Sequence, residues 1–123
     1  MNWQQAFVIM ILGHLIADYT LQGWLADGKQ LSWWQKVVPG LGGTRYEKDY
    51  IAALVCHAIY WSIFVCAPLW GSSALLPAIA VNAAVHAWVD HLKANQHAIN
   101  LIQDQLAHAV QILATFAVWV FVV

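Results

Sequence analysis

Residues 73–93 have the sequence SALLPAIAVNAAVHAWVDHLK, and this stretch decides the fold. Its first thirteen residues carry no charge, and its length matches the ~20 largely apolar residues that a helix needs to cross a bilayer. The stretch ends with His86, Asp90 and Lys93, which are ionisable groups that a membrane helix carries only where they are paired or functional. The pattern predicts a transmembrane helix with a functional polar site near one end.

Three further runs resemble it in length and composition, at residues 3–22, 50–70 and 99–123. Across the whole chain 62% of the residues are hydrophobic and 9% are charged, whereas soluble domains are about 45–50% apolar and about 25% charged. We therefore predict one all-α domain, residues 1–123, folded as an integral membrane four-helix bundle. Residues 23–49 would form a long loop between the first and second helices.

The basic residues predict how the chain is oriented in the membrane. The loop at residues 23–49 holds Lys29, Lys36, Arg45 and Lys48, the connection at residues 68–73 has no charge, and the third connection begins at Lys93. By the positive-inside rule the first and third connections face the cytoplasm. We expect a protein of the bacterial inner membrane with both termini on the non-cytoplasmic side. The net charge of −1 gives no basis for a nucleic-acid partner.

Two interpretations of the long loop remain open. Residues 31–38 include Trp33 and Trp34 and are followed by PGLGG at residues 39–43, a sequence that breaks helices. The stretch would lie along the membrane surface. There it would serve either as a plain interfacial anchor or as a lid over a site beneath it.

Histidine and aspartate recur at one spacing in three of the four predicted spans. The pairs are His14 with Asp18, His86 with Asp90, and, in reversed order, Asp104 with His108. A separation of four places both side chains on one helix face, one turn apart. The order is reversed in the last span. This is what an antiparallel helix requires if its histidine and its aspartate are to lie at the same depths as those of the other spans.

The depth of these residues predicts that they come together. The four histidines, His57 of the second span included, lie about seven to nine residues from the cytoplasmic ends of the spans, or roughly 10–14 Å deep. The three aspartates lie closer to the same ends. Lys93 is the only cation expected nearby, so a divalent ion or protons on the histidines would have to balance the carboxylates.

Imidazole and carboxylate ligands favour zinc, manganese, iron or nickel, with zinc the first expectation, while calcium prefers oxygen ligands alone. The candidate ligands are His14, Asp18, His57, His86, Asp90, Asp104 and His108. Seven exceed the four that one zinc takes, which predicts either two ions bridged by an aspartate or one ion with aspartates orienting the imidazoles. A proton or ion relay and a purely structural hydrogen-bonded core remain open.

Other polar residues are predicted to bind substrate or to link helices. Lys93 would hold a substrate phosphate or carboxylate, or simply extend to the interface. Gln22, Asn82 and Gln105 are predicted to hydrogen bond between helices. The alanine-rich face of residues 78–87 would permit a homo-oligomer.

These motifs also carry a resemblance to a known family. The stretches GHLIADYTLQ (residues 13–22), HAWVDHLK (86–93) and DQLAH (104–108), together with His57, resemble a family of small four-helix membrane proteins of bacteria and their phages, a domain of unknown function. The resemblance implies the His/Asp constellation on these positions and implies no reaction. The pattern is more loosely similar to membrane-bound metal-dependent hydrolases of bacterial inner membranes.

The leading functional hypothesis is a metal-dependent hydrolase that acts on a lipid or another membrane-located substrate. The ion would lower the pKa of a coordinated water toward ~7, with Asp18, Asp90 and Asp104 as bridging ligands or general base. The alternatives are a transport or sensing protein that binds metal or protons, and a structural or interaction protein with a polar core. The outer half of the predicted spans is nearly bare of polar residues, which weighs against transport.

Overall fold

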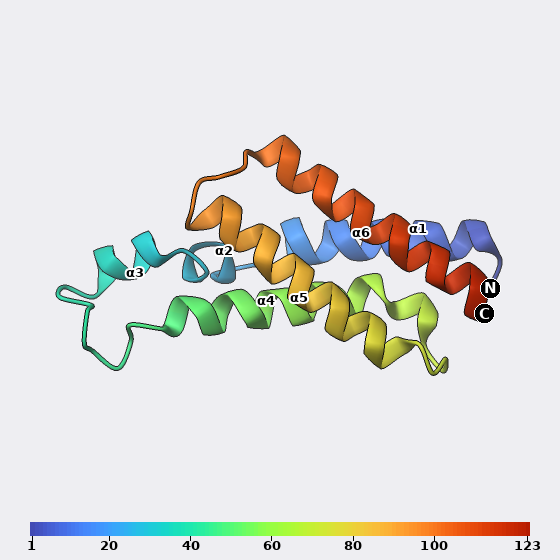
Figure 1. Ribbon diagram of the computed structural model, residues 1–123, viewed down its shortest axis with the longest axis horizontal. Helices are drawn as coiled ribbons and strands as arrows, with labels where there is room; N and C mark the ends of the chain where they lie inside the picture. The colour runs from blue at the N-terminus through green and yellow to red at the C-terminus, as the bar shows by residue number, and fades with distance from the viewer.

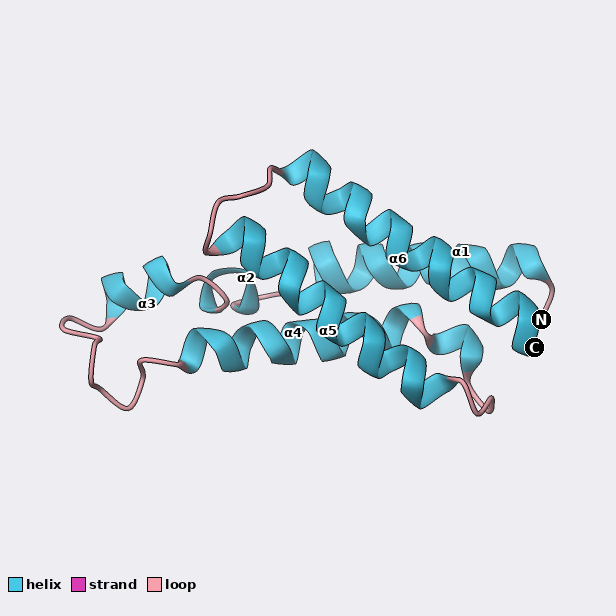
Figure 2. Ribbon diagram, in the orientation of Figure 1, coloured by secondary structure: helices cyan, strands magenta, loops and turns pink.

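The computed structural model describes all residues, 1–123, and contains helices and loops without a strand (Figures 1 and 2). This confirms the all-α prediction. Four helices are long: α1 (Trp3–Leu15), α4 (Asp49–Val65), α5 (Leu75–Ala94) and α6 (Leu101–Val122). Two short helices, α2 (Leu25–Gly28) and α3 (Leu31–Val37), lie between α1 and α4.

The helix ends differ from the predicted spans in two places. Helix α1 stops at Leu15 and continues as a π-helical turn, η1 (Ile16–Thr20), and α4 is followed by a 3₁₀ turn, η2 (Ala67–Leu69). The predicted loop at residues 23–49 contains α2 and α3, and α3 occupies most of the Trp-containing stretch. Helices α5 and α6 are long and apolar enough to cross a membrane, with mean hydropathies of 1.2 and 1.7.

Local sequence sets the starts of two long helices. Asn2 and Asn100 each accept a hydrogen bond from the backbone of a glutamine three residues later, and that glutamine's side chain accepts from the asparagine backbone. This capping box satisfies amide groups that a helix start otherwise leaves without partners. Between η2 and α5 the chain turns at Gly71, whose φ of +86° favours glycine.

The four long helices pack around a shared interior. Helix α4 contacts both α1 and α5, and α6 contacts the same two helices. Gly13 permits the approach of α1 to α4, because a Cβ at this position would lie 2.7 Å from the carbonyl oxygen of Phe64. In Figure 1 the chain termini lie together at one end of the long helices and α3 lies at the opposite end.

Polar and apolar residues are distributed unusually. His57, His86 and His108 have no exposed surface, whereas Val81 and Val110 are 64% and 66% exposed. An apolar cluster that includes Met10, Trp61, Val65, Ile112 and Trp119 fills another part of the interior. The molecule therefore buries these three histidines and presents large apolar side chains outward.

Candidate metal centre

The cluster is assembled from four elements that the sequence places far apart. Asp18 lies on η1, His57 on α4, His86 and Asp90 on α5, and Asp104 and His108 on α6. The four-residue spacing on α5 and α6 turns each His/Asp pair toward the same interior. The structure thus brings together residues from all four predicted spans.

Asp90 lies at the middle of the cluster and is 2% exposed. Its Oδ2 atom is 3.5 Å from His57 Nε2 and 3.7 Å from His86 Nε2. Its Oδ1 atom is 3.6 Å from His108 Nε2. Three imidazole nitrogens from three helices therefore point at one carboxylate.

Two sets of three residues have donor atoms close enough to hold a metal ion. The sets are Asp18 with His57 and His86, and His86 with Asp90 and His108. Within each set all donor atoms lie within 4.8 Å of one another. His86 belongs to both sets, so it is the residue on which either site depends.

Several buried atoms of the cluster have no hydrogen-bond partner. These are both ring nitrogens of His86, Nδ1 of His57, Nε2 of His108 and Oδ1 of Asp104. A buried polar atom without a partner costs about 1–3 kcal/mol. Lone pairs of nitrogen and carboxylate oxygen fit a cation, and a bound cation would supply the missing partner of more than one of these atoms.

His14 was predicted as a metal ligand, and the structure gives it another role. The Trp61 indole N–H donates to His14 Nδ1 at 2.9 Å, so that nitrogen is unprotonated. The proton then resides on Nε2, which lies 3.1 Å from Gln105 Oε1 and donates to it. Both ring nitrogens are occupied, and His14 belongs to neither set of ligands.

Trp61 was not predicted from the sequence. It is fully buried on α4, and its ring stacks on His86 at a centroid distance of 4.3 Å while its N–H bonds His14. It follows His57 by four residues, so the helical spacing contained a usable signal. Trp61 fixes the ring plane of His86 and the tautomer of His14.

Lys29 is the second residue that sequence reasoning missed. Its ammonium group donates to Asp90 Oδ2 at 2.6 Å, and the side chain is 11% exposed. Lys93 donates to Asp104 Oδ2 at 2.8 Å and is 34% exposed. The prediction that Lys93 is the only nearby cation is therefore wrong.

The backbone around Lys29 is held against the end of α5. The Asn95 side-chain amide donates to the Lys29 carbonyl at 3.0 Å, and the Leu31 N–H donates to Asn95 Oδ1 at 2.7 Å. The Trp34 indole donates to the Gly28 carbonyl at 2.7 Å. The local sequence does not distinguish Lys29 from the exposed Lys36. The contact of Lys29 with Asp90 depends on how the loop packs against a helix that is distant in the sequence.

Two amides predicted as links between helices also join the cluster. Gln105 donates to Asp18 Oδ2 at 3.2 Å and to Asp104 Oδ2 at 3.0 Å. Gln22 Nε2 lies 3.2 Å from His57 Nε2. Asp18 has contacts to an imidazole and an amide, whereas Asp90 and Asp104 each bind a lysine.

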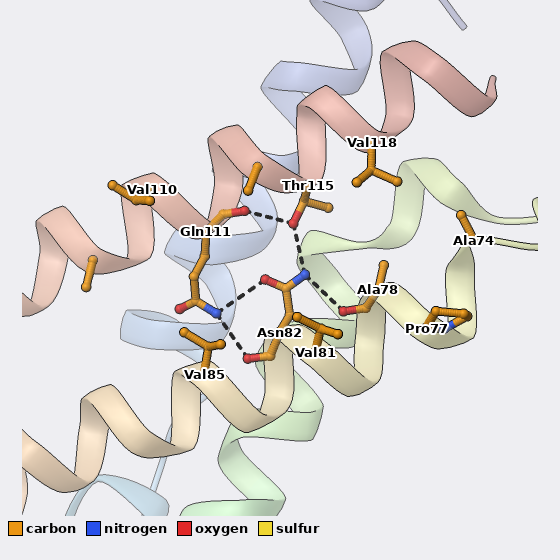
Figure 3. A pocket seen from close by; sticks show the side chains of 12 residues that line it. Ala74, Pro77, Ala78, Val81, Asn82, Val85, Val110, Gln111, Thr115 and Val118 are labelled. Atoms are coloured by element: carbon orange, nitrogen blue, oxygen red, sulfur yellow. Dashed lines mark hydrogen bonds between the residues drawn. The ribbon is translucent and has the colours of Figure 1, made fainter.

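A second polar network lies on the other side of the histidines. Asn82 donates to Thr115 at 2.9 Å, and Gln111 donates to the Asn82 carbonyl at 3.0 Å (Figure 3). Gln111 Oε1 lies 3.3 Å from His108 Nδ1, which connects this network to the cluster. The amides of this network bond mainly to one another.

Fold and site together define an all-helical protein with a buried His/Asp/Lys cluster that contains two sets of residues able to hold a metal ion. Comparison of the chain with protein-family models, with curated proteins and with solved structures found no match.

Proposed function

We propose that this chain is an integral protein of the bacterial inner membrane, a four-helix bundle that hydrolyses a lipid or other membrane-located substrate with a divalent metal ion. One observation carries the proposal. Nε2 of His86 and of His108 are completely buried, face the same carboxylate of Asp90 and have no hydrogen-bond partner.

The surface of the long helices supports the membrane assignment. Leu106, Leu113 and Val110 on α6 are 62%, 56% and 66% exposed, while Asp104 and His108 on the same helix are fully buried. Water disfavours such a surface, and lipid favours it. The charged loop between α1 and α4 then faces the cytoplasm, with both termini on the other side.

The donor set supports a transition metal. Two imidazoles and one carboxylate, as in the set of His86, Asp90 and His108, form a common three-ligand zinc site that leaves a coordination position free. Zinc is the first candidate, with manganese, iron and nickel as alternatives. Lys29 binds Asp90, a member of this set, and Lys93 binds the neighbouring carboxylate of Asp104.

A divalent ion supplies Lewis acidity, which polarises an ester or phosphoryl oxygen and acidifies water. Asp18 is the proposed general base, because it is the one aspartate of the cluster without a lysine on it. A carboxylate has about four acceptor positions, so its contacts with His57 and Gln105 leave lone pairs free. In hydrolysis the water oxygen replaces the leaving oxygen, and Asp18 passes the proton from water to that leaving group.

Metal content is the first test. We expect the detergent-purified protein to contain one or two equivalents of zinc, manganese, iron or nickel by mass spectrometry. His86→Ala should remove the metal because both ligand sets use His86. His91→Ala is the matched control, since His91 lies on the same helix outside both sets and should leave the metal content unchanged.

Catalysis is tested separately from metal binding. Asp18→Asn should keep the ion of the His86, Asp90 and His108 set, which does not use Asp18. It should lose turnover by a factor of ~10²–10⁴, the usual contribution of a general base. A parent protein that stays metal-free after supplementation would refute the hydrolase. Metal binding with full turnover in Asp18→Asn would keep the metal site and reject Asp18 as the base.

A further inference from the structure

The largest cavity of the molecule runs beside the metal centre and takes no part in the proposed hydrolysis. It is a groove between α5 and α6 with a volume of about 630 Å³ (Figure 3). Its lining contains Pro77, Val81 and Val85 from α5 and Val110 and Val118 from α6. This volume lies within the range of ~300–1,000 Å³ that is usual for small-ligand sites.

The chemistry of the groove favours hydrocarbon. No charged residue lines it, and its polar residues are Asn82, Gln111 and Thr115. The amide of Asn82 donates to Thr115 and to the Ala78 carbonyl, and the Gln111 amide donates to Asn82. Because these groups already bond to protein, the groove offers a ligand apolar contact and no free hydrogen-bonding group.

The inner end of the groove lies close to the cluster. At its inner end Val85 and Ala107 are the chain neighbours of His86 and His108. Gln111, which lines the groove, lies 3.3 Å from His108 Nδ1. A chain in this groove would therefore end one side-chain layer away from the buried imidazoles that form the proposed metal site.

The end of the cluster that lies away from the groove carries two lysines. Lys29 and Lys93 bind the carboxylates of Asp90 and Asp104 on the cytoplasmic side of the histidines. Lys93 is 34% exposed and uses one of its three N–H groups on Asp104, which leaves two for a ligand. Its ammonium is the most accessible charge of the cluster.

The net charge of the cluster determines whether an anionic or a neutral ligand is favoured. Asp18, Asp90 and Asp104 contribute −3, and Lys29 and Lys93 contribute +2, so the sum is −1 with neutral imidazoles. One divalent ion changes this sum to +1. A buried net charge is costly unless it is paired, so a ligand with one negative charge is favoured over a neutral one.

The order of charged, metal-binding and apolar groups along α5 matches the order of headgroup, linking bonds and acyl chain in a glycerophospholipid. Starting from the cytoplasmic end, α5 presents Lys93, then Asp90, then His86 seven residues deeper, at roughly 10 Å. The apolar groove begins at the next residue and extends to Pro77. We propose that the substrate is an anionic glycerophospholipid of the cytoplasmic leaflet, with its headgroup on Lys93 and one acyl chain in the α5–α6 groove.

This inference rests on the proposed function, because the bonds that join headgroup and chain would lie at the level of His86 and His108. The test measures lipid binding directly, by native mass spectrometry of the zinc-loaded protein in neutral detergent. The probes are phosphatidylglycerol, which is anionic, and phosphatidylcholine, which has no net charge. We expect one phosphatidylglycerol to bind about tenfold more tightly than phosphatidylcholine.

Two pairs of variants test the binding of the acyl chain and of the headgroup separately. Ala114→Trp fills the groove and should weaken phosphatidylglycerol binding about tenfold or more, whereas Leu113→Trp, on the next residue and outside the groove lining, should not. Lys93→Met should abolish the preference for the anionic lipid, and Lys93→Arg should keep it. Circular dichroism of each variant checks that it is folded.

Equal lipid binding by the two tryptophan variants would overturn the inference, as would an undiminished preference in folded Lys93→Met. A change of oligomeric state in Ala114→Trp, without a change in lipid binding, would assign the groove to a second copy of the chain. Binding is measured again after chelation. Lipid selectivity in a protein that never binds metal would refute the hydrolase alone, and metal binding without lipid selectivity would refute this inference alone.

Discussion

The contact between Lys29 and Asp90 joins a loop to the centre of the molecule through one buried ion pair. We expect Lys29→Met to lower the free energy of unfolding by about 3–5 kcal/mol, because it leaves a buried carboxylate without its cation. Unfolding in mixed micelles, followed by circular dichroism, measures this loss. Added zinc should restore part of it, since an ion on Asp90 replaces the missing positive charge.

Lys36→Met is the matched control for that experiment. Lys36 is an exposed lysine on α3, seven residues further along the same connection. Surface substitutions usually change stability by less than about 0.5 kcal/mol. Equal losses in the two variants would mean that the buried pair contributes nothing specific.

At the scale of single residues, the sequence predicted which side chains meet and missed how some of them are used. The four-residue spacing located His86, Asp90, Asp104 and His108 because helical geometry alone fixes which face each pair shares. The role of His14 depends on the N–H of Trp61 from another helix. The position of Lys29 depends on how a connection docks on Asn95, which no local pattern encodes.

Among the helices, α1 approaches α4 closely at Gly13. We expect Gly13→Ala to lower the free energy of unfolding by about 1–3 kcal/mol, the usual effect of overpacking, because the new methyl group meets the Phe64 carbonyl at 2.7 Å. The same unfolding measurement applies. Gly42→Ala, at a position with open space around it, should be neutral.

The sequence predicted the number and direction of the long helices more reliably than their ends. The reversed order of Asp104 and His108 required α6 to run antiparallel to α5, and the two helices do meet at these residues through the contacts of Asp90 and His108. The end of α1 was not predictable, since residues 16–20 contain no proline or glycine that would end an α-helix, yet they form a π-turn.

For the whole molecule, sidedness in the membrane is the property to measure. In a Cys56→Ser background, a maleimide that cannot cross the inner membrane should label Ser73→Cys, in the connection between η2 and α5, in cells with a permeabilised outer membrane. It should label Gly42→Cys only after the inner membrane is broken if, as we propose, the charged connection faces the cytoplasm. Cys66 is buried and should stay unlabelled in both. The reverse pattern would invert the proposed topology.

The π-turn at residues 16–20 has a consequence for how the sequence tolerates change in length. Such a turn winds one more residue than an α-turn does, and here it separates Gly13, packed on Phe64, from Asp18, beside His57. Deleting one residue within it would rotate these two by about 100° relative to each other. Only one of the two contacts would then survive. Natural variants of this protein should therefore differ by substitution in this stretch, while gaps accumulate elsewhere, as in the glycine-rich connection before α4.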